Sequence, residues 1–329
     1  GKQDITEAKE QDQEENSFFD EEEPKWRDEK EIQLVNVVNQ LEKINLMQRQ
    51  QDLTVQESCS SQVQQIVTNH SQQLIATLSL DQRVRVFQRD GKLLYSQLIK
   101  DKHPSSISFI DQQLLTAINS KQFITYDCQL QQSSQLEIKS RQNDRFSLIA
   151  PIFNAFAAVT QIQSLQLIKS NTVIKQILLQ FQPKFLKSDE NLVLIADNKL
   201  NLQILKFDDE FEVTTVKFKV QSFISSVALS SQLVAVGCQN GKIFIYQIDK
   251  LLLNDFTPLK ELSNESTKIS SVSVNEKRLF YSSQQNGGIF NVIKDEFELQ
   301  GQYLRGTCSE FVGQQLYIGK ATGEVWCYK

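Results

Sequence analysis

Two histidines, His70 and His103, are the residues of this 329-residue chain best suited to acid–base chemistry or metal binding. Neither has a Cys, Asp or Glu at the spacing that metal ligands use, and His103 stands directly before Pro104. We therefore interpret both histidines as loop or surface residues. No metal site is expected from them.

The other residue patterns that support catalysis are missing from the sequence. No serine lies in a GxSxG motif, and neither GxGxxG nor GxxxxGK[ST] occurs, so a serine nucleophile and a phosphate-binding loop are both unsupported. The five cysteines form no CxxC pair, and four of them lie in or beside apolar runs, as free thiols do in a reducing compartment. The sequence therefore predicts a binding module without a cofactor, and a hydrolase is disfavoured.

The pattern of strands predicted for this binding module is clearest between Phe223 and Leu262. Four short apolar runs are separated there by turn residues, and Asn240-Gly241 is a strong two-residue hairpin signal. The runs are Ile224 to Leu229, Leu233 to Val236, Ile243 to Ile248 and Pro258 to Leu262. Four antiparallel strands in about 40 residues are typical of one propeller blade.

The same unit recurs along the chain at spacings of about 37 to 46 residues. Its second strands are predicted to begin near Leu74, Leu114, Ala155, Leu192, Leu233, Leu279 and Leu316. The sequence therefore predicts an all-β, seven-bladed WD40-type β-propeller over residues 51–329. The last repeat stops after its third strand, so Leu53 to Gln56 is expected to supply the missing outer strand and close the ring.

The Trp-Asp signature of such blades is degenerate in this chain. It appears as Tyr126-Asp127, Tyr246-Gln247 and Trp326-Cys327, and no Gly-His dipeptide occurs. The hydrogen-bond network that these signatures support is therefore expected to be largely missing. Apolar packing between sheets should hold the blades together, through Ile75, Leu115, Val193, Val234, Phe280 and Tyr317.

Charge and periodicity set the N-terminal residues apart. Residues 1–31 carry 13 acidic and 5 basic side chains, a net charge of −8, whereas the whole chain carries −5, which leaves +3 for residues 32–329. Residues 1–27 are expected to be an acidic tail, disordered when free. Residues 28–50 are expected to form a helix, because Asp28 and Glu31 fit a capping box and Leu34, Val38 and Leu41 repeat at helical spacing. Its apolar stripe would pack on the propeller or bind a partner. No apolar run approaches membrane-spanning length.

Several passages, read in order, resemble the U-three small nucleolar RNA-associated protein eighteen family of WD-repeat small-subunit processome proteins. They are Pro24 to Glu29, Ser79 to Lys92, Val234 to Asp249, Thr257 to Leu262 with Lys268 to Val272, and Leu316 to Val325. The resemblance is strongest in blades one, five and seven. The fifty-five-kilodalton U-three protein family is a close competitor, although its members carry fuller WD and GH signatures.

The resemblance implies a non-catalytic scaffold in ribosome biogenesis, located in the nucleolus and acting in pre-rRNA processing. Its implied partners are other WD-repeat processome proteins, pre-rRNA and U-three small nucleolar RNA. Family members also recruit an exosome-associated RNA helicase through a Leu-Phe-x-apolar-Asp tail motif. The nearest match here is Phe18, Phe19 and Asp20, which lacks the leading Leu and has a shorter spacing to Asp.

A second function class explains the same sequence features. A cytoplasmic WD-repeat adaptor of a coat, ciliary or ubiquitin-ligase assembly would have the same fold and could carry the same acidic tail. The location in the cell would separate the two.

Overall fold

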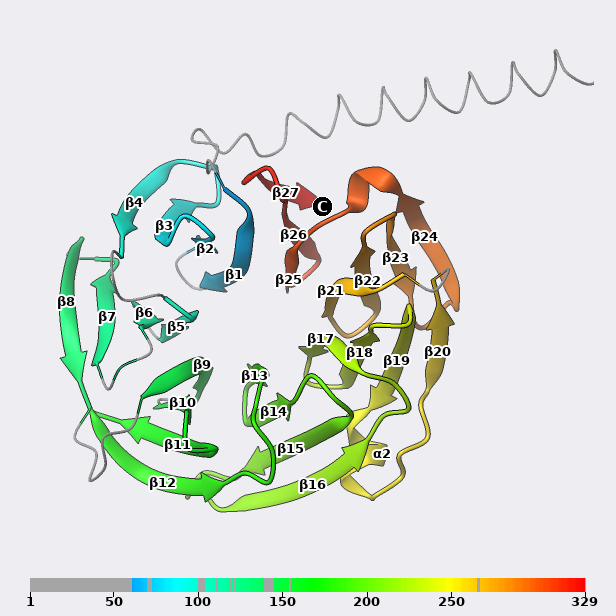
Figure 1. Cartoon of the computed structure of the whole chain (residues 1–329), viewed down its shortest axis with the longest axis horizontal. Helices are drawn as coiled ribbons and strands as arrows, with labels where there is room; N and C mark the ends of the chain where they lie inside the picture. Colours follow the sequence, from blue (N-terminus) through cyan, green and yellow to red (C-terminus); the bar gives the residue numbers. More distant parts are fainter. Residues whose placement is uncertain are drawn as a thin grey trace, which may run out of the picture. The chain divides into compact units, whose positions relative to one another are not determined.

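The computed structural model describes residues 61–328 except 70–72, 100–103, 111, 119, 121, 130, 139–144, 154 and 265–266. The described residues form seven antiparallel sheets arranged as a ring around a central opening (Figure 1). The seven-bladed propeller predicted from the repeats is therefore confirmed. The predicted tail (1–27), the predicted helix (28–50) and the predicted closing strand (Leu53 to Gln56) lie outside the described residues.

Each blade is a simple up-and-down meander, with consecutive strands hydrogen-bonded side by side. Blades one to three consist of β1 (Val63–Asn69), β2 (Leu74–Ser79), β3 (Arg83–Gln88), β4 (Leu93–Leu98); β5 (Ser106–Ile110), β6 (Gln113–Ala117), β7 (Gln122–Asp127), β8 (Gln132–Glu137); and β9 (Phe146–Ile152), β10 (Ala155–Thr160), β11 (Ser164–Lys169), β12 (Thr172–Leu178).

Blades four to seven continue the pattern. They consist of β13 (Phe185–Asp189), β14 (Leu192–Ala196), β15 (Asn201–Phe207), β16 (Val213–Lys219); β17 (Ile224–Leu229), β18 (Leu233–Cys238), β19 (Lys242–Gln247), β20 (Lys260–Ser263); β21 (Ile269–Val274), β22 (Arg278–Ser283), β23 (Gly287–Asn291), β24 (Glu296–Gly301); and β25 (Cys308–Val312), β26 (Gln315–Gly319), β27 (Val325–Tyr328).

The second strands begin within one residue of every predicted position. One boundary was wrong, because Ile248 does not end β19 but begins the short helix α2 (Ile248–Leu252). Ile248 and Leu251 are three residues apart, so both point from α2 into the core beneath blade five, where they are 2% and 0% exposed. The alternating pattern could not distinguish a strand end from this helical turn. Among the described residues, no helix is long and apolar enough to span a membrane.

Apolar packing joins every pair of neighbouring blades, as the sequence predicts. There are seven buried clusters among the described residues, and each draws side chains from two adjacent sheets. The six predicted contact residues, Ile75, Leu115, Val193, Val234, Phe280 and Tyr317, are all at most 3% exposed. At roughly 25 cal/mol per Å² of apolar area, these clusters are the main stabilising contribution to the ring.

Apolar packing is not the whole account of how the blades are joined. At the start of the first strand in five blades, a Ser or Thr hydroxyl donates to the carbonyl twelve residues later, at the end of the second strand. These pairs are Ser105–Ala117, Ser147–Val159, Ser225–Gly237, Ser270–Ser282 and Thr307–Gly319. We call these five residues the hydroxyl clips. Their hydrogen bonds are a different set from the network that the Trp-Asp and Gly-His signatures support, and they add to the apolar packing.

Three of the hydroxyl clips also reach the next blade. Ser225 Oγ lies 2.7 Å from the Ile269 carbonyl oxygen, and Ser270 Oγ lies 2.9 Å from that of Gly306. Thr307 Oγ1 donates to the Val63 carbonyl of blade one. This last bond, together with that from the Val63 backbone N–H to the Lys320 carbonyl, joins the first blade to the last. Ring closure is thus visible even without the predicted outer strand of blade seven.

Candidate interaction surfaces

The meander sorts the turns of the propeller onto two faces. Successive antiparallel strands run in opposite directions, so turns after first and third strands share one face, which we call the bottom face. Turns after second strands and the connections between blades share the other, which we call the top face. Functional side chains of propellers sit on such turns, because loops are free to vary on a rigid scaffold.

The two faces differ in charge. The bottom turns of blades four to six carry nine exposed carboxylates against three exposed lysines. The acidic residues are Glu190, Asp208, Asp209, Glu210, Glu212, Asp249, Asp255, Glu276 and Asp295, and the lysines are Lys250, Lys277 and Lys294. The described top turns and connections of blades three to five carry the exposed lysines Lys184, Lys199 and Lys268, and their one carboxylate, Asp197, is buried. The faces therefore suit partners of opposite charge.

An ion pair crosses the central channel. Lys187 Nζ on β13 lies 3.2 Å from Glu310 Oε2 on β25, which joins blade four to blade seven across the ring. Both strands face the opening (Figure 1). A hollow of about 460 Å³ on the bottom side and one of about 370 Å³ on the top side are both lined by Lys187. The channel is thus divided by the ion pair into two shallow depressions.

The bottom depression is acidic. Asp189, Glu190, Glu276 and Glu310 line it together with serines and Asn275. Burial raises the pKa of Asp189, the Glu190, Glu310 and Glu276 carboxylates raise it further, and the backbone N–H of Ser231 lowers it. The carboxylates around Asp189 favour a cationic neighbour, which Lys187 supplies within the channel.

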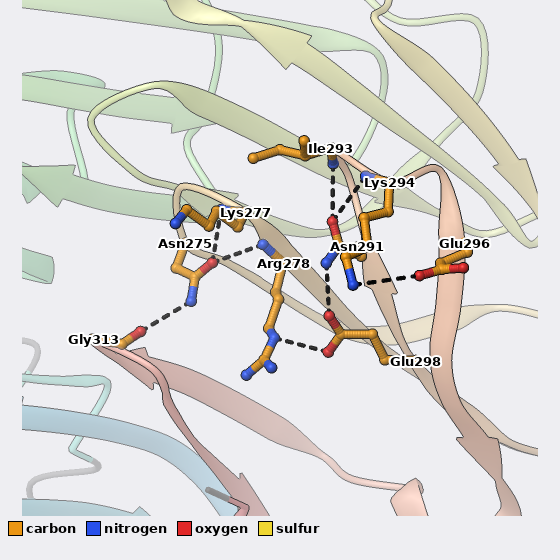
Figure 2. Close-up of polar contacts among 9 residues, drawn as sticks. All are labelled: Asn275, Lys277, Arg278, Asn291, Ile293, Lys294, Glu296, Glu298 and Gly313. Atoms are coloured by element: carbon orange, nitrogen blue, oxygen red, sulfur yellow. Dashed lines mark hydrogen bonds and ion pairs between the residues drawn. The ribbon is translucent and has the colours of Figure 1, made fainter.

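A second polar network fixes the bottom turns of blade six (Figure 2). Glu298 accepts from both Arg278, at 2.8 Å, and the Asn291 amide, at 2.7 Å. Asn291 Oδ1 in turn accepts the backbone N–H groups of Ile293 and Lys294, which shapes the β23–β24 turn. Charges in this network are paired with one another, so it rigidifies the turn and presents no open ligand position.

The same network reaches the neighbouring blade through Asn275. Its Oδ1 accepts the N–H groups of Lys277 and Arg278, and its Nδ2 donates to the Gly313 carbonyl at 2.9 Å. Gly313 belongs to the β25–β26 turn, so one side chain holds two bottom turns together (Figure 2). The bottom face of blades six and seven is therefore a rigid surface.

The described titratable groups show no catalytic arrangement. No cluster of three His, Cys, Asp or Glu residues in the described part of the chain could hold a metal ion. Burial raises the pKa of the Cys128 and Cys238 thiols to about 11, which leaves them protonated and unreactive. Burial lowers the pKa of Lys320 to about 8, and its ammonium lies 4.2 Å from the centre of the Trp326 ring.

The site residues predicted from the sequence are not among those that the structure describes. Phe18, Phe19, Asp20, Leu34, Val38 and Leu41, as well as His70 and His103, all lie outside the described residues. Sequence reasoning missed the channel ion pair, since Lys187 and Glu310 are 123 positions apart. It could have found the hydroxyl clips from their recurrence at the start of five blades.

Comparison with known families agrees with the fold. Residues 185–329, which form blades four to seven, match the model of the RSE1/DDB1/CPSF1 second beta-propeller. No match was found among curated proteins.

Three solved structures illustrate the likeness of fold. A structure of U3-55K superposes with a TM-score of 0.66 at 14% identity, covering 83% of this chain and 94% of that one. The RRP9 WD40 repeats give 0.64 at 13% identity, covering 82% and 92%. The computationally designed Ika8 protein gives 0.60 at 12% identity, covering 84% and 99%. At these identities the shared property is the overall fold.

Proposed function

We propose that this chain is a non-catalytic scaffold of ribosome biogenesis that acts in pre-rRNA processing within the small-subunit processome. The observation that carries the proposal is the register of the passages that resemble that family. Ser79 to Lys92, Val234 to Asp249 and Leu316 to Val325 cover the turn between second and third strands in blades one, five and seven. The same kind of segment is thus matched, in order, in three separate blades.

The described surfaces support a binding role. The channel is crossed by an ion pair, the thiols are protonated, and both faces consist of polar turns of contrasting charge. The propeller shared with U3-55K and RRP9 is compatible with a scaffold that holds several partners. We propose other WD-repeat processome proteins, pre-rRNA and U-three small nucleolar RNA as those partners, and the nucleolus as the location.

Two N-terminal segments extend the proposal. Phe18, Phe19 and Asp20 would recruit an exosome-associated RNA helicase, and the apolar stripe with Leu34, Val38 and Leu41 would bind a protein partner. Both use residues whose spacing was argued from the sequence.

Affinity purification of the tagged full-length chain from its own cells tests the function. We expect U-three RNA and processome propellers to co-purify, and a fluorescent fusion to accumulate in the nucleolus. In a Phe18→Ala, Phe19→Ala variant we expect loss of the helicase alone, with the other partners retained as an internal control. Capture of coat, ciliary or ubiquitin-ligase subunits with a cytoplasmic signal would establish the adaptor function in its place.

A further inference from the structure

An exposed aromatic ring stands on the top face between blades four and five. Phe223 lies in the connection from β16 to β17, and 54% of its surface is exposed. The backbone around it is tied to two turns: its carbonyl accepts the Gln239 N–H at 2.9 Å, and the Ile224 N–H donates to the Lys199 carbonyl at 2.8 Å. The ring is therefore carried by a rigid backbone, so little order has to be gained when something packs on it.

Two lysines without an ion pair to a described residue lie on the segments that adjoin Phe223, one on the β14–β15 turn and one at the end of β16. Lys199 and Lys219 are exposed, and neither forms an ion pair with any described residue. The nearby Asp197, a residue that is 4% exposed, forms no ion pair with either lysine among the described residues. It accepts the N–H groups of Lys199 and Asn201 at 2.8 and 3.0 Å. Lys242, in contrast, is paired with Glu261 and adds no net charge.

Side-chain amides complete the surface. Gln221, Gln239 and Asn240 are exposed around Phe223. Asn240 Oδ1 accepts the Lys242 N–H at 3.2 Å, an arrangement that leaves its NH₂ group directed to other acceptors. Amides can donate to and accept from the edges of an unpaired base. We call the group of Phe223, Lys199, Lys219, Gln239 and Asn240 the Phe223 surface.

We propose that the Phe223 surface binds single-stranded RNA, with a base stacked on Phe223 and phosphates bound by Lys199 and Lys219. This inference rests on the proposed function and names the surface through which RNA is held. An aromatic ring can stack only on a base that is not buried in a duplex, and lysines supply the phosphate contacts that dominate nucleic-acid affinity. The acidic bottom face repels the same ligand.

Fluorescence anisotropy with the purified full chain and a labelled single-stranded RNA of about 12 nucleotides tests the proposal. We expect Phe223→Ala to weaken binding by about tenfold, because stacking on one base is lost. Phe223→Tyr should retain the affinity, whereas Phe223→Leu should lose it like alanine. Phe153→Ala is the matched control, since Phe153 is 45% exposed on the bottom face.

The lysines are tested by salt dependence. A Lys199→Ala, Lys219→Ala variant should lower the slope of log affinity against log salt by about 1.4, or about 0.7 per phosphate contact. The control is Lys250→Ala, Lys277→Ala on the bottom face, which should leave the slope unchanged. Thermal melting of every variant establishes that each is folded.

Three results would overturn the proposal. Unchanged RNA affinity in both the Phe223→Ala and the lysine variants would exclude the surface. Full binding by Phe223→Leu would exclude stacking. Tighter capture of a labelled acidic, aromatic peptide than of RNA would make the partner a protein segment. The anisotropy assay uses purified components, so its outcome is separate from that of the co-purification experiment. RNA binding in the assay, with no U-three RNA co-purifying from cells, would reject the proposed function alone. Co-purification of U-three RNA, with no RNA binding at the Phe223 surface in the assay, would reject the surface alone.

Discussion

Burial changes the protonation behaviour of individual cysteine residues in this propeller. Cys238 is fully buried, and desolvation raises the pKa of its thiol to about 11, whereas a hydrogen bond from the Ser222 side chain and the charge of Lys242 act in the opposite direction. Burial likewise raises the pKa of the Cys308 thiol to about 12. The thiolate is the reactive form of cysteine, and these thiols stay protonated at neutral pH. They therefore fill space in the blades as small apolar groups.

The raised thiol pKa makes stability depend on alkaline pH. Below about pH 9 the thiol is protonated in both states, so it makes no difference. Above pH 9 the unfolded chain loses the proton first, and the folded state loses relative stability as pH rises towards 11. We expect Cys238→Ser to reduce the fall in unfolding free energy between pH 8 and 10.5 by about 1–2 kcal/mol. Urea titrations at both pH values measure it.

The slope with pH is the decisive quantity in that comparison. The substitution changes stability at every pH through packing, but only removal of a titrating group changes the slope. The lowered pKa of Lys320, about 8, acts in the opposite sense between pH 8 and 10.5 and is common to both proteins, so it cancels. Identical slopes would show that Cys238 does not titrate in the unfolded chain alone.

At the scale of strands and turns, the sequence carries most of the fold. Short apolar runs such as Ile243 to Tyr246, bounded by turn pairs such as Asn240-Gly241, indicate buried strands. Gly241 adopts a φ of 82°, which suits a tight turn between two strands. The sequence did not predict the helix α2, because its five residues are too few to show a helical period. Each hydroxyl clip alone looks like an ordinary residue at a strand end, and only the recurrence of a Ser or Thr at this position in five blades indicates its role.

The candidate sites were less predictable than the strands. The Phe223 surface assembles two turns and a connection, and the channel pair joins residues from opposite blades, so neither is a local pattern. Their formation depends on how whole sheets are placed around the axis. The spacing of the repeats predicts the number of blades, but it does not predict which side chains from different blades come into contact.

Among the hydroxyl clips, Ser225 offers the clearest test. Its Oγ contacts the carbonyl oxygens of Gly237 in its own blade, at 3.1 Å, and of Ile269 in the next, at 2.7 Å. Ser225→Ala should lower the unfolding free energy by about 1–2 kcal/mol, because partly buried carbonyls lose their donor. Chemical denaturation measures the change. Ser231→Ala, at an exposed serine of the same blade, should cost less than about 0.5 kcal/mol, and equal costs would refute the role.

At the scale of the molecule, ring closure depends on close approach between blade one and blade seven. A Cβ placed on Gly319 would lie 2.6 Å from Cys308 Sγ and 2.9 Å from both Cβ and Cγ1 of Val63. Val63 itself is completely buried. The absence of a side chain at Gly319 therefore lets the first strand of the ring pack against the last blade.

Gly319→Ala should therefore weaken the closure, lowering the unfolding free energy by about 1–3 kcal/mol through overpacking. Val63→Ala removes two methyl groups from the same contact, so its own cost should shrink when it is combined with Gly319→Ala. Thermal and urea unfolding of the four proteins in this cycle give the coupling energy. Strictly additive costs would mean that the two residues do not meet. Ala321→Ser, in the exposed turn that follows, serves as the neutral control.

The ion pair between Lys187 and Glu310 gives the ring a mechanical property. Contacts between neighbouring blades resist separation of the blades, but contacts along the circumference alone would still allow the ring to deform into an oval. A strut from blade four to blade seven opposes that deformation directly. Blades four and seven are therefore linked directly through this contact as well as through the blades between them.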